Sequence, residues 1–115
     1  MKKIILGCFV SLIVSNTFAK PPHVSEDQHE ENCKSISAFA YMAMGARQNG
    51  TTLSEALDIA NGITDRRQRD IGKKIVVDAY KQTKYASQEY KDNARSDFAD
   101  KYMLSCMEMY KNSNS

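Results

Sequence analysis

The sequence predicts an all-α domain, a compact bundle of about four helices closed by one disulfide. Apolar residues recur every three or four positions in four separate segments, which is the period of an amphipathic helix. The short apolar cluster Ile75-Val76-Val77 is β-branched, but it has no second strand-like run to pair with, so a sheet is not expected. Cys33 and Cys106 lie near the two ends of the helical region and can close it into one loop.

The first 19 residues are typical of a secretory signal peptide. Lys2 and Lys3 precede an apolar run over residues 4–14, which is too short to span a bilayer, and small residues follow at Thr17 and Ala19. We expect cleavage after Ala19. The mature protein would then be periplasmic or secreted and would keep no stable membrane anchor.

Lipidation is the alternative processing, because Leu6-Gly7-Cys8 resembles the end of a lipoprotein signal. In such a signal the cysteine becomes the lipidated first residue. Lipidation of Cys8 would leave most of the apolar run on the mature protein, so we favour cleavage after Ala19.

The expected mature chain is small and formally neutral. It covers positions 20–115, or 96 of the 115 residues. The whole chain has 16 Lys and Arg against 14 Asp and Glu, and loss of Lys2 and Lys3 leaves 14 against 14. Nucleic acid is not an expected partner, because net charge offers no attraction and no aromatic residues interleave with the basic ones to stack on bases.

Cleavage also removes Cys8 and leaves Cys33 and Cys106 in an oxidising compartment. An even number of cysteines in a small exported domain predicts a disulfide. In the chain-entropy model, closing so long a loop stabilises the fold by roughly 4 kcal/mol. The pairing also brings the start of the first helix to the end of the last one, so these two helices should run antiparallel.

The helical domain is expected over residues 26–111. Before it, residues 20–25 contain both prolines of the chain and should form a flexible leader. The first helix is expected over about 26–48, with Ser25 as its N-cap and Asn49-Gly50 as its stop.

The second helix is short and carries its own start and stop signals. Thr52 and Glu55 have the spacing of a capping box, in which each side chain bonds to the other residue's amide. Asn61-Gly62 ends the helix.

The third helix is expected over about 65–83 and the fourth from the Ser87 cap to about Lys111, followed by a frayed tail at 112–115. Helical spacing predicts which residues of the fourth helix are buried: Ala94, Phe98, Tyr102, Cys106 and Met109, with Leu104 or Met103 alongside.

The densest group of basic residues is the candidate partner-binding patch. It joins the end of the first helix to the basic stretch of the third: Arg47, Gln48, Arg66, Arg67, Arg69, Lys73 and Lys74. The expected partner is an envelope protein or a cell-surface component. The alternative is a solvated helix face, balanced by the neighbouring carboxylates of Asp65, Asp70 and Asp78.

Two groups of residues have metal-binding chemistry, yet we expect neither a metal site nor a cofactor. His23 and His29 lie among carboxylates, but a solvated, acidic start of a helix accounts for the same residues. The sulfur of Cys33 is not available as a thiolate ligand when it is bonded in a disulfide. The methionines allow three interpretations. Their thioethers can bind copper or silver, and their flexible side chains can fill gaps in a core or form an adaptable partner surface. These methionines are Met42, Met44, Met103, Met107 and Met109.

No enzymatic activity is predicted. The sequence has no G-x-S-x-G, H-E-x-x-H or glycine-rich phosphate motif, and no catalytic residue is proposed. Both histidines lie at the start of the mature chain, and pairing of Cys33 with Cys106 leaves no cysteine nucleophile.

One set of residues extends over most of the mature chain: Cys33-x-x-Ile36, Arg47-Gln48-x-Gly50, Asp78-Ala79-Tyr80, Phe98, Tyr102 and Cys106. Their spacing resembles that of small exported helical proteins of Gram-negative bacteria and their prophages. The resemblance implies a disulfide-closed helical domain and no particular activity.

Three functions therefore stay open. The first is a non-enzymatic periplasmic or secreted binding module. The alternative is a periplasmic stress chaperone, which resembles the small acid-stress chaperones in size, single disulfide and helical content, although the sequences do not match. The second alternative is soft-metal binding through the methionines.

Overall fold

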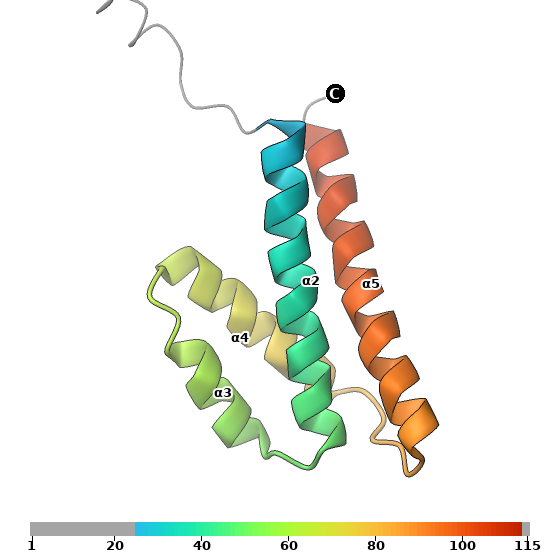
Figure 1. Cartoon of the computed structure of the whole chain (residues 1–115). Coiled ribbons are helices and arrows are strands. Elements are labelled where there is room, and N and C mark those ends of the chain that lie inside the picture. Colours follow the sequence, from blue (N-terminus) through green and yellow to red (C-terminus); the bar gives the residue numbers. More distant parts are fainter. Residues whose placement is uncertain (1–24, 114–115) are drawn as a thin grey trace, which may run out of the picture.

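A computed structural model describes residues 25–113, which form four helices and no strand. The helices, labelled as in Figure 1, are α2 (Glu26–Gln48), α3 (Leu53–Asn61), α4 (Arg66–Tyr80) and α5 (Gln88–Ser113). The predicted all-α bundle is confirmed. The expected signal peptide, with Cys8, and all of the expected leader except Ser25 lie outside the described residues.

The central helix is α2, which contacts each of the other three helices. On one side α5 lies along it in the antiparallel direction, as the disulfide argument predicted, and on the other side α3 and α4 form a hairpin that splays away (Figure 1). The start of α2 and the end of α5 therefore lie next to each other at one end of the molecule.

Side-chain caps fix the starts of the helices where the sequence predicted them. The Ser25 hydroxyl accepts a 3.1 Å hydrogen bond from the Gln28 amide, and the Ser87 hydroxyl accepts one of 3.2 Å from the Tyr90 amide. Asp65 is the cap of α4 and accepts from the Gln68 amide at 2.9 Å.

The capping box of α3 is complete. The Glu55 amide donates to Thr52 Oγ1, and the Thr52 amide donates to Glu55 Oε1, each at 3.2 Å. The hydrogen bonds from the Thr52 amide and then from its hydroxyl hold the pKa of the Glu55 carboxyl below its ordinary value.

Two helix ends differ from the prediction. The third helix ends at Tyr80 rather than at about residue 83, because side chains from the end of α2 bind the next backbone carbonyls and divert the chain. The last helix runs to Ser113, past the expected end at Lys111.

Alanines dominate the core and allow the helix backbones to approach closely. Larger side chains fill the space between the helices, and Ile36, Phe39 and Leu57 pack against the edge. The buried core residues are Ala40, Ala43, Met44, Ala56, Ala60, Ile75, Val76, Ala79 and Phe98.

The buried face of α5 is narrower than expected. Phe98 and Cys106 are buried, but Met109 is 68% exposed, so its predicted burial was wrong. Of the two alternatives at the edge, Met103 is half-buried and Leu104 is 66% exposed. α5 packs mainly against one neighbour, α2, and Leu104 lies two residues from Cys106, on the opposite side of the helix.

Candidate functional site

The predicted disulfide is present and joins the second turn of α2 to the last part of α5. The Cα atoms of Cys33 and Cys106 are 5.5 Å apart, within the usual range for a disulfide. Cys33 is fully buried and Cys106 is 9% exposed. Helix packing therefore encloses Cys33, whereas Cys106 keeps a small exposed fraction.

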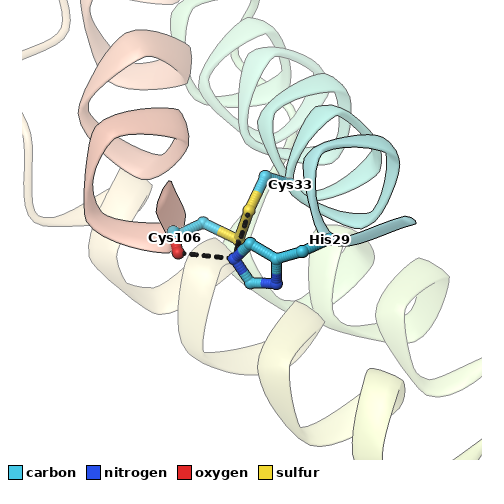
Figure 2. A group of neighbouring side chains, drawn as sticks. All are labelled: His29, Cys33 and Cys106. Carbon is cyan, nitrogen blue, oxygen red and sulfur yellow. Dashed lines mark hydrogen bonds between the residues drawn. A yellow bond between two sulfur atoms is a disulfide. The ribbon is translucent and has the colours of Figure 1, made fainter. Parts of the chain in front are cut away.

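The imidazole of His29 lies directly against this disulfide (Figure 2). Its Nε2 atom is 2.9 Å from the Cys106 carbonyl oxygen, 3.2 Å from Cys33 Sγ and 3.9 Å from Cys106 Sγ. Among residues 25–113, this is the one group of three His, Cys, Asp or Glu side chains whose ligand atoms lie within 4.8 Å of one another.

The sequence shows half of this arrangement. His29 and Cys33 are four residues apart and so share a helix face. What the sequence does not show is the register between α2 and α5, which brings the Cys106 carbonyl to the same nitrogen.

The structure does not join Gln48 and Arg47 to the basic residues of α4, so the predicted patch is not continuous. Gln48 is 1% exposed, and its amide donates to the Thr83 carbonyl at 2.7 Å and accepts from the Tyr85 amide at 2.8 Å. Arg47 donates to the Gln82 carbonyl at 3.1 Å and stacks over the Tyr80 ring. Both side chains hold the loop between α4 and α5.

The remaining basic residues of the patch all lie on α4. Arg69 is half-buried and donates to the Ile63 carbonyl at 3.2 Å, which fixes the turn between α3 and α4. The exposed ones are Arg66, Arg67, Lys73 and Lys74. Because a helix rises about 1.5 Å per residue, Arg66 lies about 20 Å along α4 from the Tyr80 end that Arg47 contacts.

A groove that sequence reasoning missed lies between the first half of α2 and the first half of α4. It has a volume of about 590 Å³, within the usual range of about 300 to 1,000 Å³ for ligand pockets. Its apolar lining consists of Ile36, Phe39, Ile63, Ile71, Gly72 and Ile75, and its polar edge of Asn32, Ser35, Asp65, Arg67 and Gln68.

A glycine lets two elements meet beside this groove. A Cβ atom on Gly72 would lie 2.9 Å from Ile63 Cδ1 and 3.4 Å from the Phe39 ring. The absence of a side chain thus allows Phe39 of α2 and Ile63 of the turn to approach α4. The spacing of the isoleucines in α4 predicted that one face of this helix is buried. It did not predict that part of this face stays open as a groove beside α2.

A polar cluster links α4 to α5. Asp78 accepts from the Tyr102 hydroxyl at 2.7 Å and from Lys101 Nζ at 3.1 Å, both at Oδ2. Burial and the Asp78 carboxylate together raise the pKa of Tyr102 above its ordinary value. The cluster holds a carboxylate in its charged form.

The methionines do not share one environment. Met44 is buried in the core, where Gln48 Nε2 donates to its sulfur at 3.4 Å. Met103 and Met107 are half-buried, whereas Met42 is exposed. Gap filling in the core therefore accounts for Met44 alone.

No helix among the described residues combines the length and the apolar character needed to cross a bilayer. Searches against models of protein families, curated protein sequences and solved structures each returned no match.

Proposed function

We propose that the chain is a small, non-enzymatic, exported binding module that recognises an envelope protein through the α2–α4 groove. One observation carries the proposal. The groove is a concave, largely apolar surface, and no other part of residues 25–113 covers it. Concave apolar surfaces with a few polar groups at the edge are the usual form of binding sites.

The charges at the groove edge indicate the chemistry of the partner. The groove edge carries one carboxylate, Asp65, which accepts a hydrogen bond as the cap of α4, and one exposed guanidinium, Arg67. Arg66 and Lys74 extend that charge along the exposed side of α4. The fitting partner segment inserts apolar side chains and carries an acidic residue beside them.

Site-specific photo-crosslinking in intact cells tests the groove. A photoreactive amino acid at Ile71, which lines the groove and is 38% exposed, should give a discrete crosslinked species with an envelope protein. The same amino acid at Ile59 is the control, because Ile59 is 61% exposed on α3 and does not line the groove. Equal crosslinking from both positions, or none from Ile71, would contradict the proposal.

A pair of charge reversals tests the role of the groove edge. Arg67→Glu should abolish most of the Ile71 crosslink, whereas Arg66→Glu should reduce it only slightly, since Arg66 is exposed on the same helix but lies outside the groove. If the two reversals have the same effect, Arg67 contributes to partner binding only through general electrostatic attraction, and recognition at the groove edge is contradicted.

Export is part of the proposal and has its own test. The mature protein recovered from a periplasmic extract should begin at Lys20 and show the mass of an unlipidated chain. An acyl group on Cys8 would support the lipoprotein alternative instead.

A stress chaperone is the second candidate, and the Asp78 cluster favours it. If Asp78 is protonated in acid, the link between α4 and α5 weakens, and loosening of the α3–α4 hairpin would expose the core face of α2. Burial raises the pKa of Asp78, but its hydrogen bonds outweigh burial and hold the pKa below the ordinary value of about 3.9. Suppression of client aggregation should therefore appear only as the pH falls well below that value, and its appearance there would support this function. Aggregation unchanged at equal mass of the protein would exclude it.

A further inference from the structure

We propose that the reduced form of this protein binds one Zn²⁺ ion through His29 Nε2 and the thiolates of Cys33 and Cys106, and that disulfide formation releases it. The proposal concerns the disulfide end of the molecule. It is independent of partner binding in the α2–α4 groove.

The donor set fits zinc. Zn²⁺ is held in proteins mainly by cysteine thiolates and histidine nitrogens in tetrahedral geometry. Two thiolates and one imidazole make three protein ligands, and His29 is only half-buried, so a water molecule has access to the fourth position.

The observed distances are close to those of a zinc site. Bonds of about 2.3 Å to sulfur and 2.0 to 2.1 Å to nitrogen place tetrahedral ligand atoms about 3.6 Å apart for nitrogen and sulfur. In the disulfide form, His29 Nε2 lies 3.2 Å from Cys33 Sγ and 3.9 Å from Cys106 Sγ. The two values lie on either side of the required distance, so the imidazole is already near both sulfurs, which move apart when the disulfide opens.

Helix packing keeps the three side chains together after the disulfide opens. His29 and Cys33 are one turn apart on α2, and α5 packs along α2 well beyond the disulfide, with Ser37 donating to the Ala99 carbonyl at 3.1 Å. Cys106 therefore stays opposite Cys33. Zinc binding also requires that the imidazole carry its proton on Nδ1, which ends any donation from Nε2 to the Cys106 carbonyl.

The redox step is a thiol–disulfide exchange. A dithiol reductant gives two electrons and two protons to the Cys33–Cys106 disulfide and itself becomes a disulfide. The two resulting thiols lose their protons when they bind Zn²⁺. In the opposite direction, a disulfide oxidant takes two electrons from the thiolates, the sulfur–sulfur bond forms again, and Zn²⁺ leaves.

The test uses the full mature chain, reduced with a phosphine and kept under anaerobic conditions. Zn²⁺ is titrated against a chromophoric chelator, and Co²⁺ serves as a spectroscopic probe. We expect one ion per chain in the reduced protein, with a thiolate-to-cobalt charge-transfer band and the visible bands of tetrahedral cobalt. The oxidised protein should bind at least 100-fold more weakly.

Two histidine variants distinguish a zinc site that includes the His29 imidazole from zinc binding by the two thiolates alone. His29→Ala should lower zinc affinity of the reduced protein by at least 10-fold and change the cobalt spectrum. His23→Ala, the change at the other histidine of the chain, should do neither. Cys106→Ser should remove the charge-transfer intensity of one thiolate.

Circular dichroism of the same samples covers the case in which reduction unfolds the chain, because zinc should then restore the helical signal. Three results would overturn the proposal. They are no stoichiometric zinc in the reduced protein, equal affinity of His29→Ala and the wild type, and zinc binding by a chain that stays unfolded.

Discussion

The hydroxyl of Tyr102 on α5 donates a 2.7 Å hydrogen bond to Oδ2 of Asp78 on α4, and so connects two helices that pack mainly on other neighbours. Lys101 donates to the same oxygen at 3.1 Å. The connection is part-buried and involves groups that titrate, so its strength depends on pH.

Acid should weaken this connection. Burial alone raises the pKa of Asp78, but the hydrogen bonds from Tyr102 and Lys101 outweigh it and hold the pKa below its ordinary value. The stabilisation is therefore present above the unfolded-state pKa and is lost as the pH falls through the folded-state pKa. Asp78→Asn should lower the free energy of unfolding by about 1.5 kcal/mol at neutral pH. Urea unfolding across the acid range should show this difference shrinking.

Alkali should weaken the same contact through Tyr102. Burial, followed by the Asp78 carboxylate, raises the pKa of the phenol above its ordinary value of 10.0. The stabilisation is therefore complete below that value and is lost as the pH rises through the folded-state pKa. Tyr102→Phe should remove this alkaline loss in urea unfolding experiments. Tyr90→Phe, at an exposed tyrosine of α5, should keep it.

Replacement of the buried Gln48 should destabilise the loop between α4 and α5. Gln48→Leu leaves the Thr83 carbonyl and the Tyr85 amide without their partner, at a cost of about 1 to 3 kcal/mol for an unsatisfied buried group. Hydrogen exchange should show faster exchange of the Tyr85 amide. Gln88→Leu removes only an exposed hydrogen bond to Asp92, so an equal loss of stability there would contradict our assignment.

Two glycines that end helices should respond differently to alanine. Gly50 has φ +87°, a left-handed conformation that costs a residue with a Cβ about 1 to 2 kcal/mol. Gly62 has φ −77°, which alanine adopts readily. Thermal unfolding should therefore show a lower midpoint for Gly50→Ala and little change for Gly62→Ala. Equal shifts would mean that backbone conformation does not set the requirement for glycine.

Loss of the disulfide should cost the largest amount of stability. Cys33 and Cys106 are 73 positions apart, and cross-linking a loop of that length stabilises by about 4 kcal/mol in the chain-entropy model. The double variant Cys33→Ala with Cys106→Ala should lose stability of that order in urea without added metal. Non-reducing mass spectrometry of the wild type should show a mass about 2 Da below that of the reduced chain.

Much of the fold follows from local sequence signals. Ser25, Thr52 and Ser87 cap helices because their side chains reach amides three residues ahead, and such contacts depend only on neighbours in sequence. The disulfide pairing followed from counting cysteines after export. Together these signals predicted four helices and an antiparallel first and last helix.

The candidate sites depend on how the helices pack, which sequence periodicity does not specify. Glutamine is a polar residue that usually lies at the surface, yet Gln48 is buried by a loop that it contacts 35 residues further along the chain. The groove exists because the first half of α4 diverges from α2 (Figure 1). The angle at which two helices cross cannot be read from the hydrophobic periodicity of either helix alone. The His29 cluster likewise depends on the register of α2 against α5.

The position of the disulfide also decides how the molecule carries a mechanical load. Cys33 and Cys106 join the first and the last described helix, at the end of the molecule where α2 begins and α5 ends. A force that pulls the start of α2 away from the end of α5 would pass from one helix to the other through this covalent bridge. The α3–α4 hairpin and every lining residue of the groove except Asn32 would stay outside the loaded path, so the domain could be tethered at both ends and keep most of its binding surface folded.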